Sequence, residues 1–297
     1  HSHWFVVLEI NRVRSEFNWL DPLRLPVGRI GIRLLQLGAP SNVAIRLRSG
    51  EGRGQSHCLE FCMPEKTIAF FPEAAVGPAL NSVGIAQACE QLGHTAVFLT
   101  DPGMSGVYEG YGFSEQVVNM SEPMPPEEMA KYWSDFINGH IPNFDLSPFE
   151  QIDNYVKECW EAIVETAIWA EKNLPRVLDE VRPDLVCVDN VVLFSAIKRY
   201  ARDQEKPWVR IISCSENEIP DPDIPPHLSG CSENDRHCFR RYEQRFLDVI
   251  RPIHERFNQF LAETGEDPYP IGQFFEASTH MNLLLYPEPV KFKRHQP

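Results

Sequence analysis

Long apolar runs are absent from this 297-residue sequence. No stretch reaches the roughly 18 consecutive apolar residues that mark a membrane-spanning helix. The N-terminus also lacks the positively charged start, apolar core and small-residue cleavage site of a secretory signal. We therefore expect a protein without a membrane span that acts in the cytoplasm.

Basic residues are scarce. The chain has 28 Lys and Arg against 42 Asp and Glu, which gives a formal net charge of −14. Contacts with nucleic-acid phosphates or with an anionic membrane need clustered Lys and Arg. We therefore expect no nucleic-acid or membrane partner, and a small molecule as the ligand.

Cys-x-x-Cys pairs are also absent, although the chain has eight cysteines. The cysteines are scattered through apolar contexts such as Val186-Cys187-Val188, a pattern typical of reduced, buried thiols rather than of a disulfide framework. One dense group follows no zinc-binding spacing, so we predict no metal site there. It lies in a predicted loop rich in Pro, Ser and Asn and consists of His227, Cys231, His237 and Cys238.

The composition changes at Met63. Residues 1–62 hold eight Arg, no Lys and five acidic residues, and they show no sustained helix or strand periodicity. The remainder is acidic, and a clean apolar strand pattern begins four residues after Met63. We interpret residues 1–62 as an atypical, non-native or disordered extension, with a genuine but poorly ordered arm as the alternative. Residues 63–297 are then one domain.

Strand and helix patterns alternate after Met63. Short apolar runs predict buried strands, and apolar residues at every third or fourth position predict helices. This alternation predicts an α/β fold, a doubly wound, Rossmann-like parallel sheet whose ligands bind at the carboxyl ends of the strands. The predicted strands are 67–71, 96–99, 184–189, 208–213 and 282–288. The predicted helices are 79–92, 125–138, 148–174 and 192–201, and Pro175 interrupts or kinks the third before a short second piece that ends near 182–183.

One helix start is marked by three residues. Ser147 is a favoured N-cap residue, Pro148 is favoured in the first turn, and Glu150 can return a hydrogen bond to the cap. We therefore predict that a helix begins at Pro148.

Three segments of this pattern resemble the family-1 glycosyltransferases, especially their bacterial macrolide-type, UDP-glycosyltransferase-like branch. Residues 67–100 contain Ile-Ala-Phe-Phe-Pro, then Leu-Asn-Ser-Val-Gly-Ile-Ala-Gln-Ala, then Leu-Gly-His-Thr-Ala-Val-Phe-Leu-Thr. The others are Arg-Pro-Asp-Leu-Val-Cys-Val-Asp at 182–189 and Asn-Leu-Leu-Leu-Tyr-Pro-Glu at 282–288. The order and spacing of the segments carry the resemblance, which covers 63–297. It implies the N-terminal, acceptor-binding half of a glycosyltransferase of the GT-B fold.

The resemblance also implies a reaction. A hexosyl group passes with inversion, and without a metal, from a nucleotide-diphosphate sugar to a hydroxyl of a small, largely apolar acceptor. The nucleotide sugar is a co-substrate, and no other cofactor is implied. Such enzymes bind the donor diphosphate with a second Rossmann-like domain, at a helix N-terminus. No segment here resembles that domain, so we expect a fragment that is inactive alone and active within the full-length enzyme.

The catalytic residues follow from the family pattern, with one departure. A His after the first strand takes the acceptor's proton in this family, and an Asp at the end of the later strand orients it. Asp189 matches the Asp, but the Gly-His pair aligns with Gly77 and Pro78. Glu73 is the only ionisable side chain between Phe71 and the predicted helix, and burial would raise its pKa towards neutrality. We predict Asp189 and Glu73 as catalytic residues; a helix cap and a solvated loop carboxylate, respectively, are the alternatives.

Polar residues after two strands and an aromatic stripe on one predicted helix are candidates for contacts with the acceptor. Packing in the core, or exposure in a solvated loop, is the alternative for each of them. His140 is also the first candidate for the base if Glu73 does not serve. The acceptor-binding candidates are Asn190, Ser215, Glu216, Asn217, Trp133, Phe136 and His140.

Two other functions fit the same pattern. One is a binding module that keeps the fold without the chemistry, which Pro78 favours because proline cannot act as a base. The other is half of a nucleotide-sugar epimerase, since epimerases share the general layout of two Rossmann-like domains.

Overall fold

The computed structural model describes residues 65–294, without 190–193, 275, 288 and 290. The side chains of four helical residues are also outside the described part: Pro126, Met129, Ala130 and Trp133. Three sequence predictions therefore fall outside the described residues, namely the extension 1–62, Asn190 and the side chain of Trp133.

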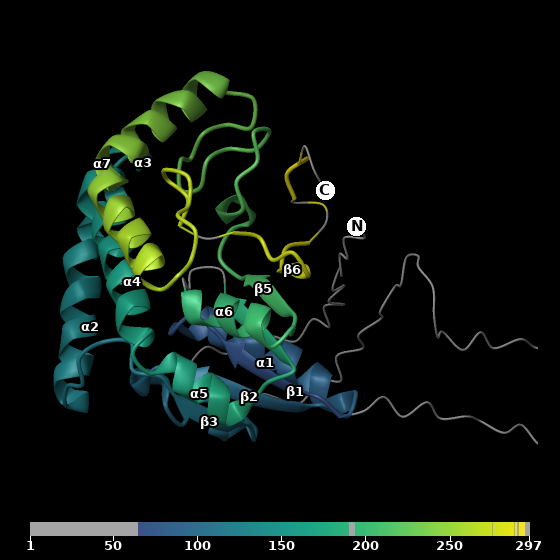
Figure 1. The fold of residues 1–297 in the computed structure, drawn as a ribbon. Helices are drawn as coiled ribbons and strands as arrows, with labels where there is room; N and C mark the ends of the chain where they lie inside the picture. Colours follow the sequence, from purple (N-terminus) through teal and green to yellow (C-terminus); the bar gives the residue numbers. More distant parts are fainter. Residues whose placement is uncertain (1–64, 190–193, 275, 288, 290, 295–297) are drawn as a thin grey trace, which may run out of the picture.

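The described residues contain one parallel sheet. Its strands are β1 (Thr67–Phe71), β2 (Thr95–Thr100), β3 (Ser114–Val117), β4 (Leu185–Asp189), β5 (Trp208–Ile212) and β6 (Met281–Leu284). They lie in the order β3-β2-β1-β4-β5-β6, and every neighbouring pair is parallel (Figure 1). The chain moves outward from β1 to β3, returns to β4 beside β1, and moves outward in the other direction. The predicted doubly wound, Rossmann-like α/β fold is confirmed.

Helices connect the strands and cover the sheet. In the described part of the chain they are α1 (Val76–Gln91), α2 (Pro126–His140), α3 (Pro148–Gln151), α4 (Lys157–Ala170), α5 (Leu174–Val181), α6 (Ser195–Asp203) and α7 (Arg236–Glu263). A π-helical turn, η4 (Ile152–Val156), joins α3 to α4, and short 3₁₀ turns are η1 (Pro102–Met104), η2 (Glu109–Tyr111), η3 (Ile141–Asp145) and η5 (Glu216–Glu218). None of the described helices is long and apolar enough to cross a membrane.

Alternate side chains of β1 enter two different cores, because successive side chains of a strand point to opposite faces of the sheet. Ala69 and Phe71 are buried with residues of α5 and α6. Ile68 and Phe70 are buried on the other face with residues of α1. In Figure 1 α5 and α6 accordingly lie on one side of the sheet and α1 on the other. Both faces of β1 are thus dry, which explains its uninterrupted apolar sequence.

A third cluster of apolar side chains lies beyond the sheet, between α4 and α7. The ring of Trp160 on α4 stacks on Phe274, with 4.3 Å between centroids. Phe257 and Ile250 of α7 are buried in the same cluster. These contacts hold the long helix α7 alongside α4 (Figure 1).

Several sequence predictions about individual elements are confirmed. The capping box at the start of α3 is present: Glu150 N donates to Ser147 Oγ at 3.4 Å, and Ser147 N donates to Glu150 Oε2 at 3.0 Å. Helix α1 begins at Val76, three residues earlier than predicted, so that Pro78 lies in its first turn. The interruption predicted at Pro175 is confirmed: Pro175 lies in the first turn of the short second helix α5, where the missing N–H of proline costs nothing.

Two elements were not predicted. Strand β3 is an edge strand whose four residues, Ser-Glu-Gln-Val, are largely exposed and therefore lack an apolar signal. Helix α7 carries an apolar stripe at helical spacing, but Pro252 inside it resembles a helix breaker. The prediction that His237 and Cys238 lie in a loop is wrong, because both belong to the first turn of α7.

A disulfide joins Cys231 to Cys238, so the prediction that all cysteines are reduced is wrong for this pair. A turn closed by the hydrogen bond from Asp235 N to Ser232 O folds the chain back just before α7 starts. The two Cα atoms are then 5.8 Å apart, within the range that a disulfide requires. Cys89, Cys159, Cys187 and Cys214 are free, as expected, although Cys214 is exposed rather than buried.

The disulfide should stabilise the fold by restricting the unfolded chain. Replacing both Cys231 and Cys238 with Ser should lower the free energy of unfolding by about 2.5 kcal/mol, the scale for a loop this short. Urea denaturation measures the difference, with Cys159→Ser, which removes a free thiol, as the control. An unfolding curve that does not change on reduction, together with peptide mapping that finds both thiols free, would contradict the assignment.

Candidate functional site

The carboxyl ends of β1 and β4 form the point where the connections of the sheet diverge. From β1 the chain leaves through α1 towards β2, and from β4 it leaves through α6 towards β5 on the other side. Loops that part in this way leave a crevice, and ligands of open α/β sheets bind there. Glu73 lies two residues after β1, and Asp189 is the last residue of β4. The two predicted catalytic residues therefore lie at the edge of the sheet where such ligands bind.

Asp189 is completely buried, with a relative exposure of 0%. The hydroxyl of Ser213, just after β5, donates to its Oδ2 at 2.6 Å. The guanidinium of Arg210, also buried, donates to its backbone carbonyl at 3.4 Å. Hydrogen bonds to an ionised acceptor are short and strong, so this environment favours Asp189 as a carboxylate.

Glu73 is partly buried and faces the charge of Asp189. Burial is the larger cause, and the charge of Asp189 the next, of a rise in its pKa from 4.5 to about 7. The Cys214 thiol donates to Glu73 Oε2 at 3.6 Å and opposes the rise. A carboxyl group with a pKa near 7 can both accept and release a proton at neutral pH, which is what a general base needs.

The turn after β5 connects these two carboxyl groups. Ser213 contacts Asp189 and Cys214 contacts Glu73, while Ser213 Oγ lies 3.9 Å from Cys214 Sγ. A continuous line of contacts thus runs from β4 through the end of β5 to the loop after β1. Three neighbouring strands build the site, so its geometry depends on the register of the sheet.

The predicted acceptor residues after β5 lie in this region, and their side chains are engaged within the protein. Ser215 caps the short turn η5 and donates to Asn217 Oδ1 at 3.0 Å. Asn217 Nδ2 donates to the carbonyl of Pro225 at 2.8 Å. Glu216 is buried, and its Oε1 accepts from Phe292 N at 2.6 Å. These residues hold the loop and the C-terminal segment in place at the crevice.

Phe136 and His140 lie at the end of α2, in a line of aromatic contacts. The ring of His140 is 4.4 Å from Phe136 and 5.2 Å from Tyr155, and its Nε2 is 3.3 Å from Glu158 Oε2. Tyr155 belongs to the same line. Burial is the chief cause that raises its pKa to about 12, and the charge of Glu73 is one of the smaller causes. Tyr155 was not among the residues predicted from the sequence.

Arg210 and Glu218 were also missed. Arg210 is the one charged residue in β5, whose five residues are all buried, and that sequence pattern was available as a signal. Burial lowers its pKa to about 10, so it remains a cation at neutral pH. Glu218 belongs to the polar turn 214–218 that the sequence pointed to, but nothing in the sequence singled it out, because only the fold of η5 buries it.

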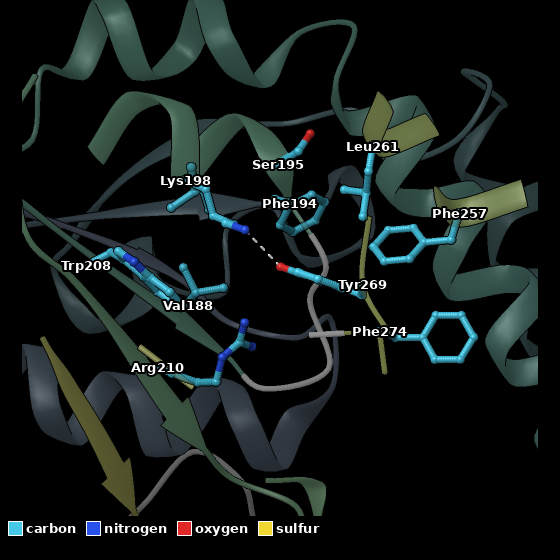
Figure 2. A pocket seen from close by; sticks show the side chains of 11 residues that line it. Val188, Phe194, Ser195, Lys198, Trp208, Arg210, Phe257, Leu261, Tyr269 and Phe274 are labelled. Carbon is cyan, nitrogen blue, oxygen red and sulfur yellow. Dashed lines mark hydrogen bonds between the residues drawn. The ribbon is translucent and has the colours of Figure 1, made fainter. Parts of the chain in front are cut away.

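Arg210 also lines a small internal cavity with Lys198, Trp208 and Tyr269 (Figure 2). Lys198 Nζ donates to the Tyr269 hydroxyl at 3.1 Å across it. The cavity volume of about 20 Å³ admits roughly one water molecule and no organic ligand. The position of Glu73 and Asp189 at the carboxyl ends of two neighbouring strands, together with the raised pKa of Glu73, makes them the candidate active site. The described residues contain no group of three or more side chains suited to a metal ion.

No family model and no curated protein matches the chain. The chain is weakly similar to several solved structures. A calicheamicin glycosyltransferase has 16% identity and a TM-score of 0.47, over 75% of this chain and 48% of that chain. The glycotransferase of kitacinnamycin has 13% identity and a TM-score of 0.46, over 75% of this chain and 46% of that chain. A third is a Streptomyces sp. SF2575 glycosyltransferase complexed with thymidine diphosphate. Its sequence identity is 13% and its TM-score 0.39, and the match covers 69% of this chain and 47% of that chain. This chain spans about half the length of each. At these TM-scores the similarity assigns neither a family nor a function to the chain.

The effect of Asp189 on Glu73 is directly testable. Asp189→Asn removes a nearby negative charge and should lower the pKa of Glu73 below about 7, though not to 4.5, because burial remains. A ¹³C NMR titration of the labelled glutamate carboxyl groups measures the shift. Asp184→Asn is the matched control, since Asp184 lies at the other end of the same strand and binds Lys206 at 2.8 Å. An unchanged Glu73 titration in Asp189→Asn would show that the two groups do not interact.

Proposed function

We propose that this chain is the acceptor-binding domain of a nucleotide-sugar-dependent glycosyltransferase. The observation that carries the proposal is the pairing of Glu73 with Asp189 at the crevice between β1 and β4, where Glu73 has a pKa of about 7. The family resemblance of 67–100, 182–189 and 282–288 supports it, because these segments form β1 to β2, β4 and β6 of the sheet.

In the proposed reaction Glu73 is the general base. Its carboxylate takes the proton of the acceptor hydroxyl as the oxygen attacks the anomeric carbon, and the bond from that carbon to the nucleotide diphosphate breaks. Attack from the face opposite the leaving group inverts the anomeric configuration. Asp189 remains a carboxylate and keeps the proton affinity of Glu73 high enough for the transfer. The diphosphate and its sugar are held by a separate donor-binding domain.

The acceptor in this proposal is a small, largely apolar molecule with a hydroxyl group. In the proposal the aromatic line of Phe136, His140 and Tyr155 supplies the apolar surface of the acceptor site. Ser215 and Asn217, in the turn after β5, supply its polar groups. A mostly apolar wall with a few polar groups is the usual composition of a small-molecule site.

A binding module without chemistry is the second candidate, and Pro78 is the observation that favours it. Pro78 lies in the first turn of α1, buried, at the position of the family's His.

The expected cytoplasmic location also stays a prediction. The disulfide between Cys231 and Cys238 argues against it, because structural disulfides are rare in that compartment.

The assignment of the base predicts a specific kinetic loss. In a full-length enzyme that contains this domain, Glu73→Gln should lower the turnover rate by about 10²-fold or more with little change in acceptor affinity. Glu90→Gln, an exposed position on α1, is the control and should keep normal turnover. Normal turnover in Glu73→Gln would exclude Glu73 as the base and make His140 the next residue to test.

The domain assignment predicts binding without turnover. The purified chain should gain thermal stability with some members of a panel of apolar, hydroxyl-bearing acceptors, because ligands that bind only the folded state stabilise it. It should transfer no sugar from any nucleotide sugar. Sugar transfer by the chain alone would overturn the division between acceptor and donor domains.

A further inference from the structure

A third carboxyl group, that of Glu218, lies at the same end of the sheet as Glu73 and Asp189. It ends the turn η5, six residues after β5. Its side chain is only 2% exposed, and its Oε1 accepts a hydrogen bond from Ser215 N at 3.2 Å. The capping box with Ser215 holds the carboxyl group in place, so the fold of the loop itself keeps this group buried.

Charged and titratable groups face Glu218 from every element around it. Asp189 at the end of β4 and Glu73 after β1 contribute negative charge. Arg210 of β5 contributes positive charge. His227 Nε2 is 4.0 Å from Glu218 Oε1, but burial lowers the pKa of His227 to about 4, so this ring is neutral above that pH. The remaining titratable neighbours are Cys214 and Tyr286.

Three carboxyl groups in one largely dry site cannot all be ionised at modest cost, because each charge loses hydration and repels the others. Arg210 is the buried cation beside them and donates to the Asp189 carbonyl. Asp189 is stabilised as the anion by the Ser213 hydroxyl at 2.6 Å. Glu73 has the most access to solvent of the three, since Asp189 and Glu218 are both buried.

We propose that Glu218 is a third functional carboxyl group of this site and that it carries a proton at neutral pH, acting as a neutral hydrogen-bond donor beside the Glu73–Asp189 pair. Its role as a positioning residue in sugar transfer rests on the function proposed above, whereas its protonation does not. A neutral Glu218 leaves Glu73 free to ionise near pH 7 without facing a second buried carboxylate.

The order of ionisation agrees with this role. Burial, then the charges of Asp189 and Glu73, raise the pKa of Glu218 from 4.5 to about 8, and the hydrogen bond from Ser215 and the charge of Arg210 oppose the rise. Glu73, with a pKa of about 7, loses its proton first. Its negative charge then helps to keep the proton on Glu218.

Protonation of Glu218 has a consequence for stability with a definite sign. Between about pH 4.5 and pH 8 the folded state holds a proton that the unfolded chain has lost. The native state then binds more protons than the unfolded state, so stability falls as pH rises through this window. The unfolding constant of the wild type, relative to that of a variant without this carboxyl group, should rise about tenfold per pH unit.

Infrared difference spectroscopy of the wild-type chain tests the protonation directly. A spectrum recorded below pH 7 minus one recorded well above pH 8 should show the C=O stretch of buried carboxylic acids. In Glu218→Gln one component, the one that titrates at the higher pH, should disappear, and the component from Glu73 should remain. A wild-type spectrum without any carboxylic-acid band near neutral pH would overturn the proposal even if the variant failed to fold.

Urea unfolding between about pH 5.5 and pH 7.5 provides the second test. The ratio of unfolding constants, wild type over Glu218→Gln, should grow with pH as stated, and Gln should still accept the hydrogen bond from Ser215. Glu216→Gln is the matched control from the same turn, because the Glu216 carboxylate accepts a hydrogen bond from Phe292 N. A ratio independent of pH would overturn the proposal. Neither test needs a sugar donor, so a failed glycosyltransferase assignment would appear only in turnover, with Glu218 still protonated.

Discussion

The interaction on which the rest of the site depends is the burial of one carboxylate, Asp189, at the end of a central strand. An ion without solvent contact must be stabilised by hydrogen bonds and nearby charge. Ser213, just after β5, donates a hydrogen bond to the carboxylate, and Arg210 of β5 supplies positive charge and a hydrogen bond to the Asp189 backbone carbonyl. The register of β4 against β5 pairs Asp189 with Ile211, so Arg210 and Ser213, which lie close to Ile211 in the chain, are near Asp189. The charge of Asp189 then raises the proton affinity of Glu73 and Glu218.

A carboxyl group can replace an imidazole as base only if its environment raises its pKa. Pro78 aligns with the family's His and cannot replace it as a base, because the proline side chain has no ionisable group; it lies buried in the first turn of α1. Glu73, five residues before Pro78, lies just after the carboxyl end of β1. Burial contributes most of its shifted pKa and Asp189 the next share. Glu73 therefore has a pKa near neutrality, as a general base at neutral pH requires, although the family has a His as the base.

The sheet and the position of the two catalytic candidates follow from sequence because both are local patterns. Apolar runs mark β1 and β4, and the ionisable residue nearest the carboxyl end of each is read off directly: Glu73, two residues after β1, and Asp189, the last residue of β4. Glu218 could not be selected in this way, since its burial depends on how η5 folds against β4 and β5. The same limit applies to the disulfide, which depends on a turn that brings Cys231 back to α7. Edge strand β3 lacks an apolar face, and Pro252 masks the periodicity of α7.

The central claim is that Glu73 and Asp189 interact across one crevice, and a double-mutant cycle tests it most directly. Unfolding free energies of the wild type, Glu73→Gln, Asp189→Asn and the double variant are measured at pH 9, where both carboxyl groups are ionised. Because each single substitution relieves the same repulsion, the effects should depart from additivity by about 0.5–3 kcal/mol, and the departure should shrink at pH 5, where Glu73 is protonated. Effects that add to within about 0.5 kcal/mol at pH 9 would contradict the account.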